Sequence, residues 1–247
     1  MAEALLSARG VTVRFGGLVA VDGVDVDVRE RELIGIIGPN GAGKTTFFHT
    51  LSGVLRPTTG RLTVRGHDLT GKPPHAFAIH GIARTFQTPR VFREMTAETN
   101  VRFGLEFAGR RRRHPHDAFD DARSILAFLN LADAADVPAG ALTPARQRLL
   151  EIGMAFATRP DVLLLDEVAA GLTERELEAT ADLIRRVRDE LGVAVVWIEH
   201  AVRALMGVVE RVIVLHQGKK IADGPPATVA RDPAVMEAYL GGEGGAT

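Results

Sequence analysis

A glycine-rich segment that ends in a lysine and a threonine is the part of this sequence best suited to phosphate chemistry. Residues 38–45 match the pattern G-x-x-x-x-G-K-[ST]. Glycines allow the backbone to curve around phosphate groups with its N–H groups pointing inward, and the positive end of a following helix adds to the attraction. The ammonium of Lys44 would reach the β- and γ-phosphates, and the hydroxyl of Thr45 would be a ligand of Mg²⁺. The residues predicted to contact a nucleotide here are Gly38, Pro39, Asn40, Gly41, Ala42, Gly43, Lys44, Thr45 and Thr46.

Two adjacent carboxylates follow a short apolar run further along the chain. Val162–Leu165 is typical of a buried strand, and Asp166 and Glu167 come directly after it. Ligands of a parallel sheet bind at the carboxyl ends of its strands. This position predicts that Asp166 holds Mg²⁺ through a water molecule and that Glu167 polarises an attacking water. The competing interpretation is a strand that ends in a solvated acidic turn. The presence of the predicted phosphate-binding segment makes this interpretation less favoured.

Both groups need a sheet and a helix to position them. Leu33–Ile37 is an apolar run typical of a central strand, and helix-compatible sequence extends from Lys44 to Leu51, so the glycine-rich segment has the strand–loop–helix context that it requires. Further strands are predicted over Leu5–Phe15, Val19–Val28, Arg61–Arg65, Ile82–Phe86, Val193–Ile198 and Val212–Leu215. Helices are predicted over Glu98–Ala108, Asp117–Leu129, Pro144–Thr158 and Glu174–Leu191.

The distribution of these elements predicts an α/β fold with an insertion. Between about residues 88 and 158 the sequence contains helical patterns and no convincing strand. The expected organisation is therefore a single domain over 1–247, with a core over 1–87 and 159–247 and a helical subdomain over about 88–158.

Composition excludes several classes of protein. The chain has 247 residues, 30 Lys and Arg against 31 Asp and Glu, and no cysteine. The near-zero net charge gives no support to binding of nucleic acid, and the lack of cysteine excludes disulfides, thiolate metal sites and cysteine catalysis. No run approaches the roughly 20 apolar residues of a membrane span, and no signal peptide is visible. A cytoplasmic protein that reaches the membrane only through partners is the expectation.

Three further residues indicate a function only when they are considered together. Phe15, Gln87 and His200 would separately pass as a core aromatic, a loop amide and a surface histidine. With the two motifs above, they make the chain resemble the ATP-binding subunits of ABC transporters. The resemblance implies a P-loop NTPase core of the ABC-ATPase type with an antiparallel β subdomain and an inserted helical subdomain. It also implies that Phe15 stacks on adenine, that Gln87 senses Mg²⁺ and water, and that His200 contacts the γ-phosphate.

Longer segments are similar to the ATPases of branched-chain and hydrophobic amino-acid importers. They are RFGGLVAVDGV at 14–24, GIARTFQ at 81–87, REMTAETNV at 93–101 and the tail at 212–242. The resemblance implies ATP and Mg²⁺ as cofactors, with Thr45, Gln87 and Asp166 at the metal. It implies a second ATPase subunit, itself or a paralogue, two membrane permeases, an extracytoplasmic solute-binding protein, and a place on the inner face of the membrane. The groove near residues 87–91 is expected to receive a permease helix. Nucleic acid is not an expected partner, and the solute is not fixed by the sequence.

The signature segment departs from the family pattern L-S-G-G-Q. Residues 142–146 read Leu-Thr-Pro-Ala-Arg. In the family this segment contacts the ATP held by the opposing subunit. Thr143 keeps a hydroxyl and suits a helix N-cap, whereas Pro144 removes one N–H donor. Smaller departures are Val168, where the family has proline, and Ala201, where the subfamily has aspartate. A weakened contact with the opposite nucleotide is expected.

Three functions therefore compete. An ATP-hydrolysing import motor leads; a low-turnover nucleotide-dependent partner subunit is second, because of the altered signature. A non-transport ABC ATPase that acts on nucleic acid or ribosomes is third, and the neutral charge argues against it. The run Arg110–Arg113 is interpreted as a solvated loop, with contact to acidic lipid headgroups or to an acidic partner as the alternative.

Overall fold

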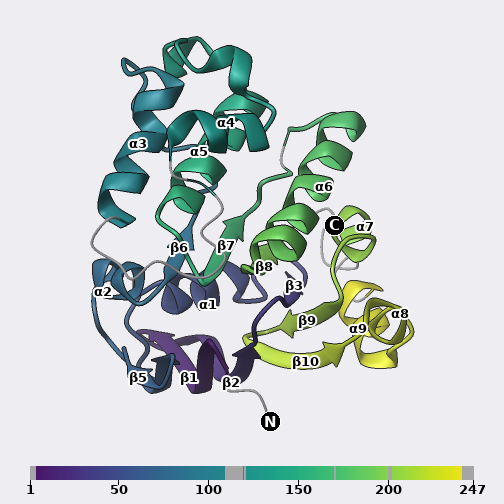
Figure 1. The fold of residues 1–247 in the computed structure, drawn as a ribbon. Coiled ribbons are helices and arrows are strands. Elements are labelled where there is room, and N and C mark those ends of the chain that lie inside the picture. The colour runs from purple at the N-terminus through teal and green to yellow at the C-terminus, as the bar shows by residue number, and fades with distance from the viewer. Residues whose placement is uncertain (1–3, 109–118, 120, 170, 200–201, 241–247) are drawn as a thin grey trace.

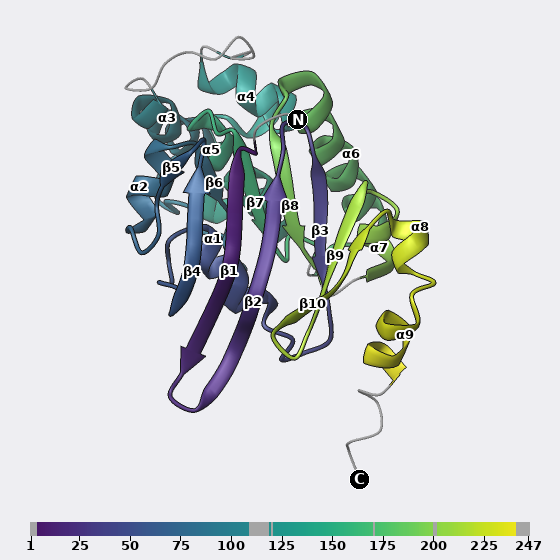
Figure 2. The ribbon, with the colours of Figure 1, turned by 90° about the horizontal axis from the view of Figure 1, so that it is seen from below.

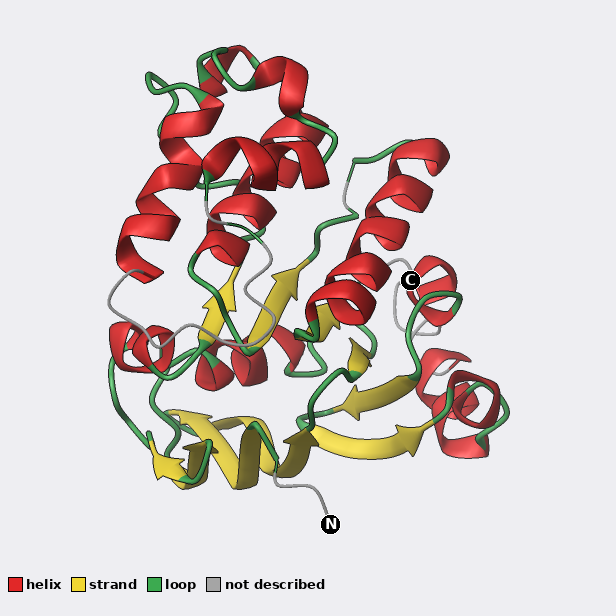
Figure 3. Ribbon diagram, in the orientation of Figure 1, coloured by secondary structure: helices red, strands yellow, loops and turns green. Residues whose placement is uncertain are grey.

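The structure is a computed structural model, and it describes residues 4–108, 119, 121–169, 171–199 and 202–240. Two sheets lie on either side of helix α1 (Lys44–Leu51), and a group of helices covers the far side of the larger sheet (Figures 1 and 3). No helix in this described part of the chain has both the length and the apolar character needed to cross a bilayer.

The larger sheet has six strands in the order β10-β9-β3-β8-β7-β6, parallel except for β10 at one edge. Its strands are β3 (Leu33–Ile37), β6 (Ile82–Arg84), β7 (Val162–Asp166), β8 (Ala194–Ile198), β9 (Arg211–His216) and β10 (Lys219–Gly224). All five residues of β3 are buried, because both faces of the strand are covered. Leu33 and Ile37 pack toward the helices, whereas Ile34 and Ile36 pack toward α1 and the smaller sheet.

The smaller sheet is antiparallel, with four strands in the order β2-β1-β4-β5. Its strands are β1 (Leu6–Phe15), β2 (Leu18–Val28), β4 (Thr59–Val64) and β5 (His67–Asp68). Val24, Val26 and Val28 are buried and alternate with Asp25 and Asp27, as expected of a sheet with one wet face. Figure 2 shows β1, β2 and β4 side by side, with α8 (Pro226–Val229) and α9 (Pro233–Leu240) next to β9 and β10.

Helices α3, α4 and α5 pack together and form what we term the helical lobe (residues 97–157) (Figure 1). They are α3 (Ala97–Ala108), α4 (Ala122–Phe128) and α5 (Pro144–Ala157), with 3₁₀ turns at Ala132–Ala134 and Ala139–Ala141. Helices α3 and α5 approach so closely that a Cβ atom at Gly104 would lie 2.6 Å from the main-chain oxygen of Met154. Glycine at this position therefore permits the packing of the two helices.

Helix α6 (Glu174–Leu191) follows the predicted bounds because both ends carry strong signals. Thr173 and Glu176 form a capping box at its start, and Gly192 ends it with φ 70°. The strands and helices expected from apolar periodicity are all present, with ends shifted by a few residues. The sequence reading missed β5, β10, α2 (Pro74–Ile79), α7 (Val202–Met206), α8 and α9. Residues 110–113 lie outside the described residues.

Candidate functional site

The glycine-rich segment joins the end of β3 to the start of α1. Gly43 is the N-cap residue of α1, with φ 95°, and Gly38 has φ 152°. A Cβ atom on Gly38 would overlap the main-chain oxygen of Leu215, and one on Gly43 would overlap that of Ala20. Both positions therefore require glycine, and the loop lies tightly against β9 and β2.

Lys44 is buried and turns back over its own loop. Its ammonium donates hydrogen bonds to the carbonyl oxygens of Gly38 (2.7 Å) and Pro39 (3.0 Å). Burial lowers the pKa of the ammonium, and the negative charge of Glu167 acts in the opposite direction. The loop and the start of α1 thus surround a positive charge, which is the arrangement that attracts phosphate.

A groove of about 530 Å³ lies beside this loop. The loop forms one wall and the tips of β1 and β2 the other, and the ring of Phe15 is 51% exposed at that wall. The groove can thus take phosphates at the loop and a flat aromatic base at Phe15. The residues that line it are Phe15, Leu18, Val19, Ala20, Asn40, Gly41, Ala42, Gly43, Lys44, Thr45, Thr46 and Gln217.

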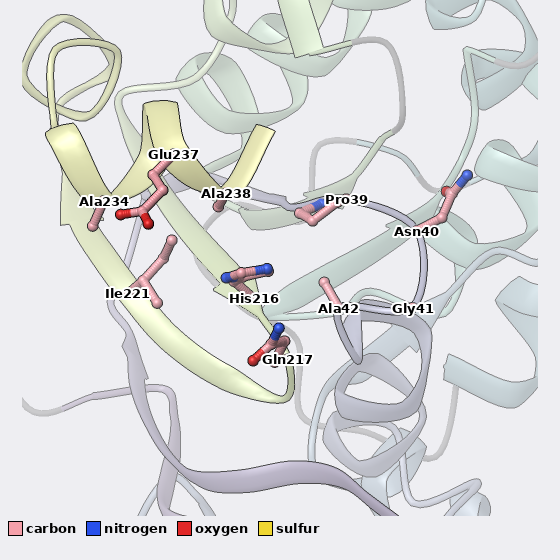
Figure 4. A pocket seen from close by; sticks show the side chains of 10 residues that line it. All are labelled: Pro39, Asn40, Gly41, Ala42, His216, Gln217, Ile221, Ala234, Glu237 and Ala238. Carbon is pink, nitrogen blue, oxygen red and sulfur yellow. The ribbon is translucent and has the colours of Figure 1, made fainter. Parts of the chain in front are cut away.

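A second hollow, of about 600 Å³, lies on the other side of the loop, between it and α9 (Figure 4). Asn40, Gly41, Ala42 and Gln217 border both hollows, whereas Pro39 borders only this one. The remaining side chains around it are His216, Ile221, Ala234, Glu237 and Ala238. The C-terminal helix therefore lies next to the glycine-rich loop.

Gln87 and Glu167 meet although 80 positions separate them. Gln87 Nε2 donates a hydrogen bond of 2.7 Å to Glu167 Oε2. Glu167 has φ 49°, in the left-handed region, and its N–H donates to Ile198 O at 3.0 Å. Arg148 of α5 donates to the main-chain oxygens of Glu167 (2.7 Å) and Gln87 (3.1 Å). The backbone on both sides of the paired side chains is therefore tied to the helical lobe.

Asp166 forms a buried ion pair with Arg84, at 3.0 Å. Arg84 also donates to Ser52 Oγ at 2.8 Å, and its guanidinium lies over the rings of Phe48 and Phe86. Burial raises the pKa of Asp166, and the cation of Arg84 opposes this effect. The pattern GIARTFQ alone did not predict this role of Arg84. A basic residue three positions before Gln87, at the end of an apolar strand, was the available signal.

The donors predicted for Mg²⁺ fit the chemistry of that ion. Thr45, Gln87 and Asp166 offer hydroxyl, amide and carboxylate oxygens, the ligands that Mg²⁺ prefers. Within the described residues, no group of three or more His, Asp or Glu side chains is placed to hold a metal. A single carboxylate suits an ion that is shared with nucleotide phosphates.

Two family models match the chain. One, described as ABC transporter, matches residues 21–170, and one described as Branched-chain amino acid ATP-binding cassette transporter matches residues 219–245. The chain is 40% identical to the high-affinity branched-chain amino acid transport ATP-binding protein BraF of Pseudomonas aeruginosa, over 98% of this chain and 99% of BraF. The chain belongs to the ABC transporter ATP-binding proteins. LivG of Escherichia coli K12, with the same description as BraF, is 38% identical with the same coverage.

Other ABC proteins are similar at slightly lower identity. The lipopolysaccharide export system ATP-binding protein LptB of Acidithiobacillus ferridurans is 35% identical over 96% of this chain and 97% of LptB. A crystal structure of a nucleotide-free ATP-binding cassette from an ABC transporter matches with TM-score 0.82 and 28% identity, over 96% of this chain and 99% of that chain. The ADP conformation of such a cassette matches with TM-score 0.83 and 29% identity, over 97% and 100%. The predicted fold class and family are thus confirmed.

Residues 142–146, predicted to be the signature segment, lie at the start of helix α5. Thr143 Oγ1 accepts a hydrogen bond of 3.4 Å from Arg146 N, and Pro144 occupies the first turn, as predicted. The side chain of Arg146 pairs with Asp133. Thr143 is exposed and lines neither hollow beside the glycine-rich loop.

Strand β8 leads to His200, which with Ala201 lies outside the described residues. Just before it, Glu199 is buried and its Oε1 accepts hydrogen bonds from Trp197 Nε1 (3.1 Å) and Ala169 N (2.6 Å). Glu199 therefore ties the segment after the acidic pair to the end of β8. The sequence reading missed this contact, because nothing in the pattern WIEH indicates which way the carboxylate points.

Proposed function

We propose that this ABC protein is the ATP-hydrolysing subunit of an importer for branched-chain or related amino acids. The hydrogen bond between Gln87 and Glu167 carries the hydrolytic part of the proposal. It joins the two side chains expected to handle water, and the charge of Glu167 acts on the phosphate-binding ammonium of Lys44. Such a pair beside a groove of nucleotide size suits phosphoryl transfer to water.

In this mechanism the chain first binds ATP along the groove, with adenine against Phe15 and the phosphates at Lys44 and the loop N–H groups. Mg²⁺, when bound by Thr45, Gln87 and Asp166 together with phosphate oxygens, would neutralise charge on the phosphates. Glu167 accepts a hydrogen bond from a water molecule and takes its proton as the water oxygen attacks the γ-phosphorus. The bond from the γ-phosphorus to the bridging oxygen breaks, ADP and phosphate leave, and Glu167 returns its proton to the released phosphate or to solvent water. His200 would contact the γ-phosphate.

Removal of the carboxylate tests this assignment. We expect Glu167→Gln to lower the steady-state rate of phosphate release by about 10²–10⁴-fold, the contribution typical of general-base catalysis. Nucleotide affinity, measured by calorimetry, should stay within about twofold because the variant leaves the loop intact. Glu190→Gln, at an exposed glutamate of α6, is the matched control. A Glu167→Gln protein that hydrolyses ATP at the control rate would refute the proposal.

The amino-acid part rests on the relatives. BraF and LivG are described as branched-chain amino acid transport ATP-binding proteins, and the family model with a branched-chain description matches residues 219–245. Of this segment, β10 and α9 border the hollow beside the glycine-rich loop. The chain would then act with a second ATPase subunit, two permeases and an extracytoplasmic solute-binding protein, at the inner face of the membrane. In proteoliposomes that contain the whole assembly, leucine should stimulate ATP hydrolysis and urea should not. The opposite order would reassign the solute.

An apolar patch supports contact with a permease. Phe92, Met95, Phe103 and Phe107 are each 39–50% exposed, and the rings of Phe92 and Phe103 touch at 5.1 Å between centroids. Phe92 directly follows residues 87–91, where a permease helix is expected to bind, and its ring joins that segment to Phe103 of α3. Exposed apolar patches of this kind favour protein partners. A cysteine placed at residue 92 should cross-link to a permease in the assembled complex, and failure to do so would contradict the assignment.

A low-turnover subunit is the second candidate, and the signature segment favours it. Pro144 offers no N–H donor, and Arg146 is engaged with Asp133. Loss of one preorganised donor costs about 10²–10³-fold in rate. The double variant Pro144→Gly/Ala145→Gly should therefore hydrolyse ATP faster, as a homodimer and beside a paralogue. If neither assembly gains rate, the altered signature does not limit turnover and this candidate fails.

A further inference from the structure

Helix α5 carries two buried ionisable residues that the proposed mechanism does not use. Arg148 is 8% exposed and Glu151 is 4% exposed, and they lie three positions apart on the helix that begins at the signature segment. Burial of charged groups costs free energy unless hydrogen bonds compensate for it. The partners of these two side chains therefore indicate what they do.

Both residues bind main-chain atoms around the pair of Gln87 and Glu167. The guanidinium of Arg148 reaches the carbonyl oxygens of both, at 3.1 Å and 2.7 Å. Glu151 Oε1 accepts hydrogen bonds from the N–H groups of Phe86 (3.3 Å) and Arg90 (2.9 Å). The two side chains thus hold the loop before and after Gln87 and the peptide that carries Glu167.

The peptide of Glu167 needs such support. A residue other than glycine at φ 49° is in a left-handed conformation that costs about 1–2 kcal/mol. The direction of its carboxylate, and hence its 2.7 Å contact with Gln87, follows from that backbone conformation. The guanidinium of Arg148 donates a hydrogen bond to the carbonyl oxygen of Glu167. This bond stabilises the left-handed conformation, because a charge-assisted hydrogen bond is stronger than a neutral one.

We propose that Arg148 and Glu151 are positioning residues for ATP hydrolysis, which hold the backbone of Gln87 and Glu167 so that the carboxylate faces the attacking water. This inference rests on the proposed role of Glu167 as the base. Neither residue touches the nucleotide groove, so they act only through the residues that they hold. They also fix the geometry of this site to the helix whose first turn is expected to meet the opposite nucleotide.

Arg148→Met removes both donors and keeps the length of the side chain. We expect the rate of ATP hydrolysis to fall about 10–100-fold, since misplacement by about 1 Å can cost 10²-fold. The dissociation constant for ATP should stay within about twofold, because the groove is unchanged. The rate of ATP hydrolysis by Arg148→Lys should lie between the rates of Arg148→Met and the parent. Arg123→Met removes an exposed arginine with two carboxylate partners from the same lobe and should retain the parent rate.

Glu151 offers a conservative rescue. Both of its hydrogen bonds end on Oε1, and Oε2 is buried without a hydrogen-bond partner. Glu151→Gln can therefore keep both bonds and should hydrolyse ATP within about threefold of the parent, whereas Glu151→Met should lose about tenfold. Equal rates in the two variants would overturn the role of Glu151.

A double-mutant cycle distinguishes an effect of Arg148 on the position of the Glu167 carboxylate from a general loss of protein stability. In the Glu167→Gln background, Arg148→Met should change the residual rate by less than about twofold, because its effect passes through the missing carboxylate. The inference would be overturned if Arg148→Met lowered the rate of ATP hydrolysis in the Glu167→Gln background as much as it does in the parent. It would also be overturned if Arg148→Met or Arg148→Lys alone hydrolysed ATP at the parent rate. If Glu167→Gln itself hydrolyses ATP like the parent, the proposed function fails instead. Should Arg148→Met not fold, Arg148→Lys provides the same measurement.

Discussion

The buried carboxyl of Glu151 makes the stability of this protein depend on pH. Burial raises its pKa from 4.5 to about 7, against the opposing effects of two backbone N–H donors and of the cations of Arg148 and Arg90. The folded state therefore binds this proton more tightly than the unfolded state does. As pH rises from about 4.5 to about 7, this group lowers the free energy of unfolding, and outside that window its contribution is constant.

The size of the effect follows from the two pKa values. At about 1.4 kcal/mol for each pH unit between them, ionisation of Glu151 costs the folded state about 3 kcal/mol above pH 7. Glu151→Gln removes the titration and keeps the acceptor at Oε1. The difference in unfolding free energy, variant minus parent, should therefore rise by about 3 kcal/mol between pH 4.5 and pH 7.5 in favour of the variant.

Urea unfolding followed by circular dichroism, at half-unit steps of pH and without nucleotide, measures this difference. All other titrating groups are shared by the two proteins and cancel. Glu190→Gln, at an exposed glutamate of α6, should show a difference below about 0.5 kcal/mol at every pH. A Glu151→Gln difference that stays constant from pH 4.5 to pH 7.5 would refute the argument that burial raises the pKa of this carboxyl.

Three other changes test the site and the packing around it. Lys44→Ala should weaken ATP binding at least about tenfold in a calorimetric titration, because it removes a phosphate partner, and unchanged affinity would contradict the groove assignment. Arg84→Met leaves the buried carboxylate of Asp166 unpaired and should lower the free energy of unfolding by about 3–5 kcal/mol. Arg61→Met breaks the exposed ion pair with Asp68 and should lower the free energy of unfolding by about 1 kcal/mol or less. Gly104→Ala should cost about 1–3 kcal/mol by overpacking α3 against α5, while Gly17→Ala, with open space around it, should cost less, as thermal unfolding can measure.

Local signals predicted the elements near the nucleotide groove. The range Lys44–Leu51 was predicted to the residue because Gly43 and the preceding strand bound it on the N-terminal side. Strand β10 and helix α9 were missed as elements for different reasons. Lys219–Gly224 is an edge strand in which every residue is exposed or half-buried, and the short run Pro233–Leu240 has no clear apolar periodicity.

Tertiary contacts of the site were beyond sequence reasoning. The bond between Gln87 and Glu167 depends on how β6 and β7 pair, and that pairing has no local signature. Arg148 and Glu151 did leave a signal, since both fall among the apolar residues of the buried face of α5. Which backbone atoms they bind depends on how the helical lobe sits on the core, and no spacing in the sequence encodes that arrangement.

The single tryptophan of the chain gives this protein a built-in optical reporter. Trp197 is fully buried on β8, and its indole N–H donates to Glu199, which also accepts from Ala169 N behind the acidic pair. Any rearrangement between that segment and the end of β8 changes the hydrogen bond and the polarity around the indole. Its emission wavelength and lifetime therefore follow that rearrangement in the unlabelled protein. Stopped-flow fluorescence can thus time this movement against phosphate release, with no dye attached and no cysteine introduced.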